Sequence, residues 1–238
     1  MLTEHKQHNV LDRGFIKLVD SMGDDAAIVQ AARVSYSKGT KTKREDDKLI
    51  EYLLKNKHWT PFEMVVLKFH VKLPMFVARQ WQRHRASTYN ELSARYSILS
   101  KDYYIPELDR VQSQSLTNKQ GSGKELSLAI RKVIIEQMQE HSKKSYKSYE
   151  SLLELGLARE LARAVLPVNF YTEFYWKVDL RNLFHFITLR RDDHAQYEIR
   201  VYAEALLEML KELVPIATQA YLNNEKEQDA LLTRHKQA

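Results

Sequence analysis

The sequence contains no cysteine among its 238 residues. This absence excludes a disulfide framework, a zinc or iron–sulfur site with cysteine ligands, and catalysis by a cysteine nucleophile. Glycine is also scarce, with 6 residues, and neither GxGxxG nor GxxxxGK[ST] occurs. The fragment GSGK at 121–124 has Asn118 where a P-loop needs glycine, so a polar loop is expected there. A phosphorylated ligand would therefore have to be held by side chains.

Long apolar runs are missing as well. No stretch approaches the roughly 18 residues that a membrane helix needs, and the segment MLTEHKQHNVLDRG lacks the apolar core of a signal peptide. A soluble, cytoplasmic protein is the expectation. Lys and Arg number 37 against 31 Asp and Glu, and this excess favours anionic partners such as nucleotides, phosphorylated cofactors or nucleic acid. A mildly basic surface without such a partner is the alternative.

The hydrophobic pattern predicts a mixed α/β fold. Leu67, Phe69, Val71 and Leu73 alternate with polar residues, which indicates a half-buried strand. A second strand is predicted over 169–178, where aromatic and β-branched residues gather. Helices are predicted over about 25–36, 44–56, 75–85, 125–155, 159–166, 180–191 and 192–213.

The remaining segments are polar. Residues 86–104 are predicted to form a structured loop, 112–124 a mobile linker, and 223–238 a fraying tail. No internal repeat or domain boundary is evident. We therefore expect one domain over 1–238, with its core at about 10–220 and helices packed on a central sheet.

The densest polar stretch covers residues 79–96, RQWQRHRASTYNELSARY. On a helix, Gln80, Arg83 and His84 would share one face through their i, i+3 and i+4 spacing. Guanidinium groups bind phosphate through paired hydrogen bonds and keep their charge at neutral pH. The stretch therefore suits a phosphorylated ligand whose sugar hydroxyls need acceptors such as Glu91. A solvated basic helix end is the alternative for the tripeptide alone.

The larger pattern resembles a known family. In RHRASTYNELS, Arg83-His84-Arg85 is followed after seven residues by Ser93, and this resembles the signature of the flavin-dependent thymidylate synthases. The signature is extended by ARY at 94–96. Five other segments resemble the family in the same order: AARVSY at 31–36, HWTPFE at 58–63, FVARQW at 76–81, ARAVLPVNFYT at 162–172 and LRRDDHAQYEI at 189–199. The resemblance covers about residues 10–220.

The resemblance implies a specific reaction. Such enzymes methylate deoxyuridine monophosphate (dUMP) at ring carbon 5, with carbon from 5,10-methylenetetrahydrofolate and reducing equivalents from NADPH through bound FAD. It also implies a mixed α/β fold, a homotetramer with active sites between subunits, and no nucleic-acid or membrane partner. Because reduced flavin supplies hydride, no protein nucleophile is required, in keeping with the missing cysteine. Ser93 has no orienting base guaranteed by the sequence, so it is assigned to substrate binding.

The resemblance also implies site residues. Those implied to hold dUMP are Gln80, Trp81, Gln82, Arg83, Glu91, Leu92, Ser93, Ala94, Arg95, Arg163 and Arg190. Those implied to contact FAD are Ser35, His58, Thr60, Glu63, Arg83, His84, Arg85, Glu91, Asp179, Arg181 and His185. Arg190 matches the arginine near the uracil ring, where it would stabilise negative charge, and is the implied catalytic residue. No metal is implied.

Two positions depart from the family pattern. Asp179 and His185 stand where asparagines can occur, and both side chains can still hydrogen-bond to a flavin nucleotide. Because Asp179 would repel a pyrophosphate, its contact is expected with the flavin ring or ribose. Arg181, on the same helical face as His185, would offset the negative charge.

Other features favour plainer interpretations. His194 and Glu198 have the i, i+4 spacing of helical metal ligands, but no third ligand is evident, so a surface or interface pair is favoured. The aromatic run 170–176 favours a buried strand or interface over a stacking platform. The cluster Lys38, Lys41, Lys43 and Arg44 fits a solvated loop, nucleic acid or a polyglutamyl tail. A basic nucleic-acid-binding protein and a family member without turnover are the rival functions; the intact arginines speak against the second.

Overall fold

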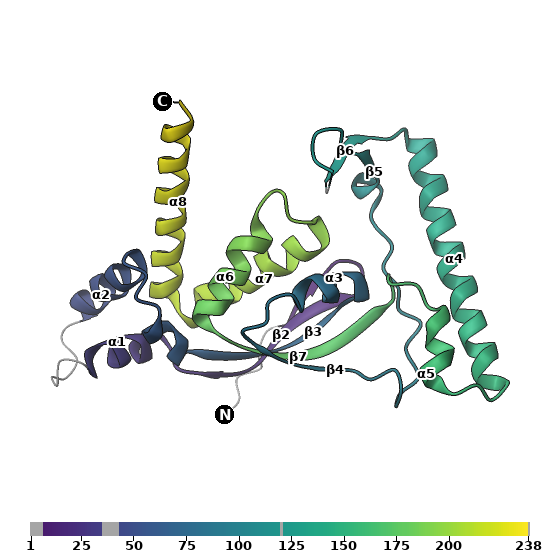
Figure 1. Ribbon diagram of the computed structural model, residues 1–238, viewed down its shortest axis with the longest axis horizontal. Coiled ribbons are helices and arrows are strands. Elements are labelled where there is room, and N and C mark those ends of the chain that lie inside the picture. Colours follow the sequence, from purple (N-terminus) through teal and green to yellow (C-terminus); the bar gives the residue numbers. More distant parts are fainter. Residues whose placement is uncertain (1–6, 35–42, 120, 238) are drawn as a thin grey trace.

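A five-stranded antiparallel sheet forms the centre of the fold, with strand order β1-β2-β3-β7-β4. The structure is a computed structural model that describes residues 7–34, 43–119 and 121–237 (Figure 1). The strands are β1 (Gln7–Val10), β2 (Gly14–Met22), β3 (Val66–Pro74), β4 (Thr88–Glu91) and β7 (Tyr171–Asp179). The predicted mixed α/β fold, with helices on a central sheet, is confirmed.

Helices α3 (Met75–Trp81), α6 (Leu180–Arg191) and α7 (Tyr197–Leu213) cover one face of the sheet (Figure 1). The alternation in β3 explains this, since Leu67, Phe69 and Val71 are buried beneath these helices. On β7, Phe174 and Trp176 point to the same face, where Trp176 lies opposite Phe69. The aromatic run at 170–176 is therefore a buried strand, as predicted.

The other helices extend the fold at its two ends. Figure 1 shows α1, α2 and α8 at one end of the sheet, and α4 with a small β-hairpin at the other. These elements are α1 (Asp25–Arg33), α2 (Lys43–Lys55), α4 (Leu128–Glu154), α5 (Arg159–Ala162) and α8 (Pro215–Gln237), with short 3₁₀ turns at Thr60–Met64, Leu108–Arg110 and Arg163–Val165. A small apolar cluster that includes Tyr146, Tyr149 and Phe170 attaches α4 to the body. No helix in the described ranges has the length and apolarity needed to cross a membrane.

Several predicted boundaries agree with the structure. Asp24 caps α1 by accepting a hydrogen bond from the amide of Ala27 at 3.1 Å. Helix α4 ends before Gly156, whose φ of 86° is the left-handed conformation that glycine favours after a helix. Helix α6 has the predicted bounds 180–191.

Three predicted segments have a different secondary structure from the one expected. The helix predicted over 75–85 ends at Trp81, because the hydroxyl of Tyr89 bonds to the carbonyls of Trp81 and His84 as the chain turns toward β4. The predicted linker 112–124 contains the hairpin strands β5 (Gln112–Gln114) and β6 (Ser122–Glu125). The tail predicted to fray belongs to α8, which continues to Gln237. Within it, Glu227 pairs with Lys55 of α2 at 3.0 Å.

Three further differences concern strands that were not predicted and the start of one helix. Strands β1 and β2 were not predicted, although Ile16 and Leu18 on β2 alternate with polar residues and are buried. The helix predicted over 192–213 begins at Tyr197, since Asp192 accepts the amide of His194 at 2.7 Å and holds a turn. Strand β4, inside the predicted loop, is a polar edge strand without apolar alternation.

One buried carboxylate joins the two ends of the sequence. Asp25 at the start of α1 is 9% exposed and accepts hydrogen bonds from the amides of Ile216 at 3.0 Å and Ala217 at 2.9 Å. These amides belong to the first turn of α8, where a carboxylate also complements the helix dipole.

We expect Asp25→Ala to lower the free energy of unfolding by about 2 kcal/mol, because two buried amides lose their acceptor. Asp25→Asn keeps one oxygen acceptor and should lose about half as much. Urea denaturation of both variants measures the difference. Equal stability of Asp25→Ala and the wild type would show that Asp25 does not hold α8.

Candidate active site

A cleft of about 750 Å³ lies where the C-terminal ends of α3 and α6 meet over the sheet. Ligand sites commonly have volumes of about 300–1,000 Å³. Its lining comprises Gln80, Arg83, His84, Arg85, Ala86, Ser87, Trp176, Val178, Asn182, His185, Leu189 and Arg190. Six of these residues are among those implied by the sequence: Gln80, Arg83, His84, Arg85, His185 and Arg190.

The sheet brings these distant segments together. Strand β3 leads directly into α3 at Pro74, and β7 leads into α6 at Asp179. Since β3 and β7 are antiparallel, with Val66 opposite Asp179 and Pro74 opposite Tyr171, the two helices start from opposite ends of one strand pair. Their C-terminal ends therefore converge over the same face.

Arg190 is fixed by two hydrogen bonds at the centre of the cleft. Its Nε donates to Nε2 of His84 at 3.0 Å, and its second terminal nitrogen donates to the carbonyl of Gln80 at 3.1 Å. The carbonyl of Gln80 lies in the last turn of α3, the negative end of that helix, where a cation is stabilised. The remaining N–H groups of Arg190 are available to a ligand, because a guanidinium has five donors.

His84 is held in its neutral form. Burial first, then the charges of Arg190 and His185, lower the pKa of His84 from its ordinary 6.5 to about 4. A neutral imidazole has one acceptor nitrogen, and the bond from Arg190 assigns that role to Nε2. His84 thus orients Arg190 without adding a second positive charge beside it.

The cleft is cationic, and none of the described residues that line it is an internal counterion. Arg83, Arg85 and Arg190 line it, and its lining contains no carboxylate. Burial first, then the charge of Arg83, lower the pKa of Arg190, as expected for a partly buried guanidinium beside a second positive charge. Trp176 and Val178 are buried below and supply an apolar floor. The arrangement fits an anionic ligand that carries a flat ring.

Other residues implied to bind dUMP lie away from the cleft of Arg190, in the segment after β4 and beside α5. Leu92, Ser93, Ala94 and Arg95 follow β4, and Arg95 pairs with Glu160 of α5 at 3.3 Å. Nε of Arg163 donates to the carbonyl of Glu160 at 3.3 Å. Arg95 lines a separate hollow of about 520 Å³ together with Arg159 and Glu160. Within one chain, these residues do not line the cleft of Arg190.

Glu91 and Gln82 bond to neighbouring side chains, and Trp81 is buried. The carboxylate of Glu91 accepts hydrogen bonds from Thr172 Oγ1 at 2.7 Å and Gln82 Nε2 at 3.1 Å. The indole of Trp81 is fully buried against Trp176 and Phe186. A contact of Trp81 with dUMP would therefore have to come from its backbone.

The implied FAD residues are also divided. His58 and Thr60 line an apolar groove of about 860 Å³ at the end of the fold that carries α1 and α2. Glu63 forms an ion pair with Arg181, so Arg181 neutralises Glu63 rather than Asp179. Ser35, together with Lys38 and Lys41, lies outside the described residues.

Asp179 acts as the cap of α6. Its carboxylate accepts hydrogen bonds from the backbone amide of Asn182 at 2.9 Å and from the Asn182 side chain at 2.7 Å. The side-chain bond turns the amide group of Asn182 toward Asp179, and Asn182 also lines the cleft. Asp179 therefore positions a cleft residue through a local contact.

Sequence reasoning missed Asn182 and Leu189 on α6, as well as Ala86, Ser87, Trp176 and Val178. A signal for the first two existed, because they lie at i−3 and i+4 from His185 on a correctly predicted helix. The others depend on how the turn after α3 packs on β7, which spacing alone does not reveal.

His194 and Glu198, which the sequence presents as metal ligands or as a surface or interface pair, have separate partners in the structure. His194 bonds to Asp192 at 2.8 Å before α7 begins, whereas Glu198 is buried and pairs with Arg110 at 2.9 Å. The two side chains are therefore not a surface pair. Among the described residues, no cluster of three or more His, Cys, Asp or Glu side chains could hold a metal ion.

The neutral state of His84 predicts a pH effect on stability. Above pH 6.5 the imidazole is neutral in the folded and the unfolded chain; between 6.5 and about 4 only the unfolded chain takes up the proton, so stability falls as the pH falls. Glutamine does not titrate, so in His84→Gln the free energy of unfolding should fall by about 1 kcal/mol less than in the wild type as the pH is lowered. The value is kept small because His84 is partly exposed to solvent. Urea denaturation from pH 4 to 8 measures it. Parallel profiles for the two proteins would contradict the prediction.

Comparisons with known proteins point to one family. The model of the Thy1 family, described as thymidylate synthase complementing protein, matches residues 17–216. A flavin-dependent thymidylate synthase of Wolbachia pipientis wMel is 56% identical over 218 residues, which cover 92% of this chain and 77% of the relative. One from a strain of Thermus thermophilus is 57% identical over 212 residues, covering 89% of this chain and 77% of the relative.

A solved structure has the same fold. The UMP/dUMP methylase PolB from Streptomyces cacaoi, bound with 5-Br UMP, aligns with a TM-score of 0.81 and 31% identity, covering 91% of this chain and 96% of that one. The second structure, bound with 5-Br dUMP, aligns with a TM-score of 0.82. Together with the matched family model and the relatives above 50% identity, these likenesses establish that the chain belongs to the flavin-dependent thymidylate synthase family.

Proposed function

We propose that this protein converts dUMP to thymidylate in the cytoplasm, with 5,10-methylenetetrahydrofolate as carbon donor, FAD as the flavin and NADPH as reductant. The observation that carries the proposal is the cleft of Arg190, where three arginines and no carboxylate line a pocket above an apolar floor. Family membership supports the same reaction, and the names of the relatives support a flavin.

The residues of the cleft fit both a nucleotide and a flavin. Guanidinium groups at Arg83, Arg85 and Arg190 match phosphate and ring oxygens, and His185 and Asn182 add hydrogen-bonding groups on α6. Trp176 and Val178, which are 0% and 2% exposed, add apolar side chains to the cleft lining. When bound, FAD supplies the hydride that reduces the transferred carbon to a methyl group.

Arg190 has the most direct chemical role in this proposal. Its free N–H groups would donate to the uracil ring and stabilise the negative charge that the ring carries once it is activated, before carbon 5 attacks the carbon donor. His84 and the carbonyl of Gln80 fix the guanidinium beforehand, so little reorganisation is needed when charge develops. Arg83 would contact the same ligand as Arg190 and would bind an anionic group of that ligand at the entrance of the cleft.

The divided site residues support a shared active site. Arg190 lies in one cleft, whereas Arg95 and Arg163 lie beside a different hollow. In a homotetramer, the hollow of one subunit can complete the cleft of another. Apolar side chains exposed on α4, including Ile130 at 50% and Val133 at 51%, support such contacts.

An anaerobic assay tests the function. Protein, dUMP, methylenetetrahydrofolate and NADPH should yield thymidylate only when FAD is present. Arg190→Ala should stay folded and yellow with FAD but lose at least about 100-fold in rate, the typical cost of removing one donor to a developing charge. Product is measured by chromatography, and bound flavin by its absorbance.

The neighbouring arginine gives a matched control. Arg191 pairs with Glu225 of α8 at 3.4 Å and does not line the cleft, so Arg191→Ala should keep its activity. Normal turnover by Arg190→Ala would remove its catalytic assignment. A wild-type protein that never takes up FAD would contradict the proposed function itself.

A mixing experiment tests whether sites are shared. Arg190→Ala and Arg163→Ala should each be inactive, yet co-expressed chains should regain about a quarter of the wild-type rate, because about one site in four then combines two intact arginines. Each variant co-expressed with itself is the control. Mixed assemblies no more active than their parents would show that both arginines act within one chain.

A further inference from the structure

A polar chain runs from the cleft to a buried carboxylate outside it. Glu198, near the start of α7, is only 3% exposed. One of its oxygens accepts hydrogen bonds from the Tyr104 hydroxyl at 3.1 Å and from Nε of Arg110 at 2.9 Å. The other accepts one from the side-chain amide nitrogen of Gln196 at 2.8 Å and a longer one from Nη2 of Arg110 at 3.5 Å. The side-chain oxygen of Gln196 in turn accepts a hydrogen bond from the side-chain amide nitrogen of Gln80, and Gln80 lines the cleft.

The carboxylate fixes the direction of every bond in this chain. A carboxylate paired with arginine only accepts, so Gln196 must turn its NH₂ group toward Glu198 and its oxygen toward Gln80. Gln80 must then donate to Gln196 through its own NH₂ group. The side-chain oxygen of Gln80 is left as an acceptor for the cleft. Without Glu198, the two amides would have no such preference, because each carries a donor and an acceptor.

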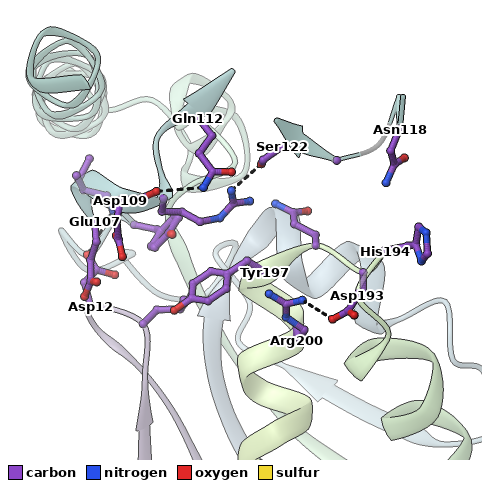
Figure 2. A pocket seen from close by; sticks show the side chains of 17 residues that line it. Asp12, Glu107, Asp109, Gln112, Asn118, Ser122, Asp193, His194, Tyr197 and Arg200 are labelled. Atoms are coloured by element: carbon purple, nitrogen blue, oxygen red, sulfur yellow. Dashed lines mark hydrogen bonds and ion pairs between the residues drawn. The ribbon is translucent and has the colours of Figure 1, made fainter. Parts of the chain in front are cut away.

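Glu198 is anchored from the side of the β5–β6 hairpin. A neighbouring pocket of about 400 Å³ lies at this hairpin, and Figure 2 shows Ser122 at its edge. Ser122 accepts a hydrogen bond from Nη1 of Arg110 at 2.7 Å. The Arg110 guanidinium also lies 5.5 Å from the centre of the Tyr197 ring. Arg110 is thus held by Ser122, Tyr197 and Glu198, and none of these three lines the cleft of Arg190.

We propose that Glu198 is a positioning residue that acts on the nucleotide through Gln196 and Gln80. It keeps the oxygen of the Gln80 amide directed to a donor group of dUMP, an N–H or O–H, and prevents the reversed amide from presenting its NH₂ group there. The inference rests on the proposed function, in which the cleft binds dUMP.

The substitution Glu198→Gln should reverse the donor and acceptor direction of the hydrogen bonds that link residue 198 to Gln196 and Gln80. The new amide must keep its oxygen toward Arg110, which can only donate, and so turns its NH₂ group toward Gln196. Gln196 and Gln80 reverse in response, and Gln80 presents its NH₂ group to the nucleotide. We expect the KM for dUMP to rise about tenfold while kcat changes less than about twofold, because one hydrogen bond is replaced by a mismatched group. Bound FAD should be unchanged.

A second substitution should rescue the first. In Glu198→Gln/Gln196→Glu, the carboxylate at 196 accepts from both neighbours and returns Gln80 to its original direction. The KM for dUMP should come back to within about twofold of the wild type. Glu208→Gln on the same helix, which removes a surface pair with Lys211, is the matched control. A merely structural role of Glu198 would not be restored by this exchange.

The outcomes separate the inference from the function. A wild-type protein that forms no thymidylate would overturn the proposed function, and the inference with it. An active wild type with an unchanged KM in Glu198→Gln, or no rescue by the exchange, overturns the inference alone. If Glu198→Gln does not fold, Gln196→Leu leaves Glu198, Arg110 and Tyr104 in place; a raised KM supports the proposal, and an unchanged KM contradicts it.

Discussion

The antiparallel register of β3 and β7 is the constraint on which the rest of the structure depends. It places Phe69 opposite Trp176 and fixes where α3 and α6 leave the sheet, at opposite ends of one strand pair. A shift by one residue would turn the buried side chains of a strand to its other face. The meeting of Arg190 with the last turn of α3 is therefore decided by strand pairing before any polar contact forms.

Two levels of polar contact are built on this frame. The first holds Arg190 through His84, whose low pKa leaves an acceptor where a cation needs one. The second holds the amide of Gln80 through a chain that ends at Glu198. Both remove freedom from side chains before a ligand arrives, which is how fixed dipoles contribute most to binding and catalysis.

Much of the fold follows from local patterns, and the failures have a common cause. The alternation around Phe69, the start of α1 at Asp25 and the bounds of α6 depend on neighbours in sequence, and the sequence predicts them correctly. The end of α3 and the β5–β6 hairpin depend on distant partners, such as the Tyr89 hydroxyl and Arg110. Within the candidate site, family resemblance located Arg190 and His84, and helical spacing from His185 could have located Asn182, but the roles of Ser87, Trp176 and Glu198 depend on how distant segments pack in space.

The uncompensated charge of the cleft has a consequence for handling the protein. Because Arg83, Arg85 and Arg190 have no carboxylate among the residues that line the cleft with them, small anions from the surrounding solution will collect there. Phosphate or sulfate buffers will then occupy part of the space that a nucleotide needs, and added salt will weaken nucleotide attraction by screening. Purification in a buffer with bulky, weakly coordinating anions keeps these three guanidinium groups accessible.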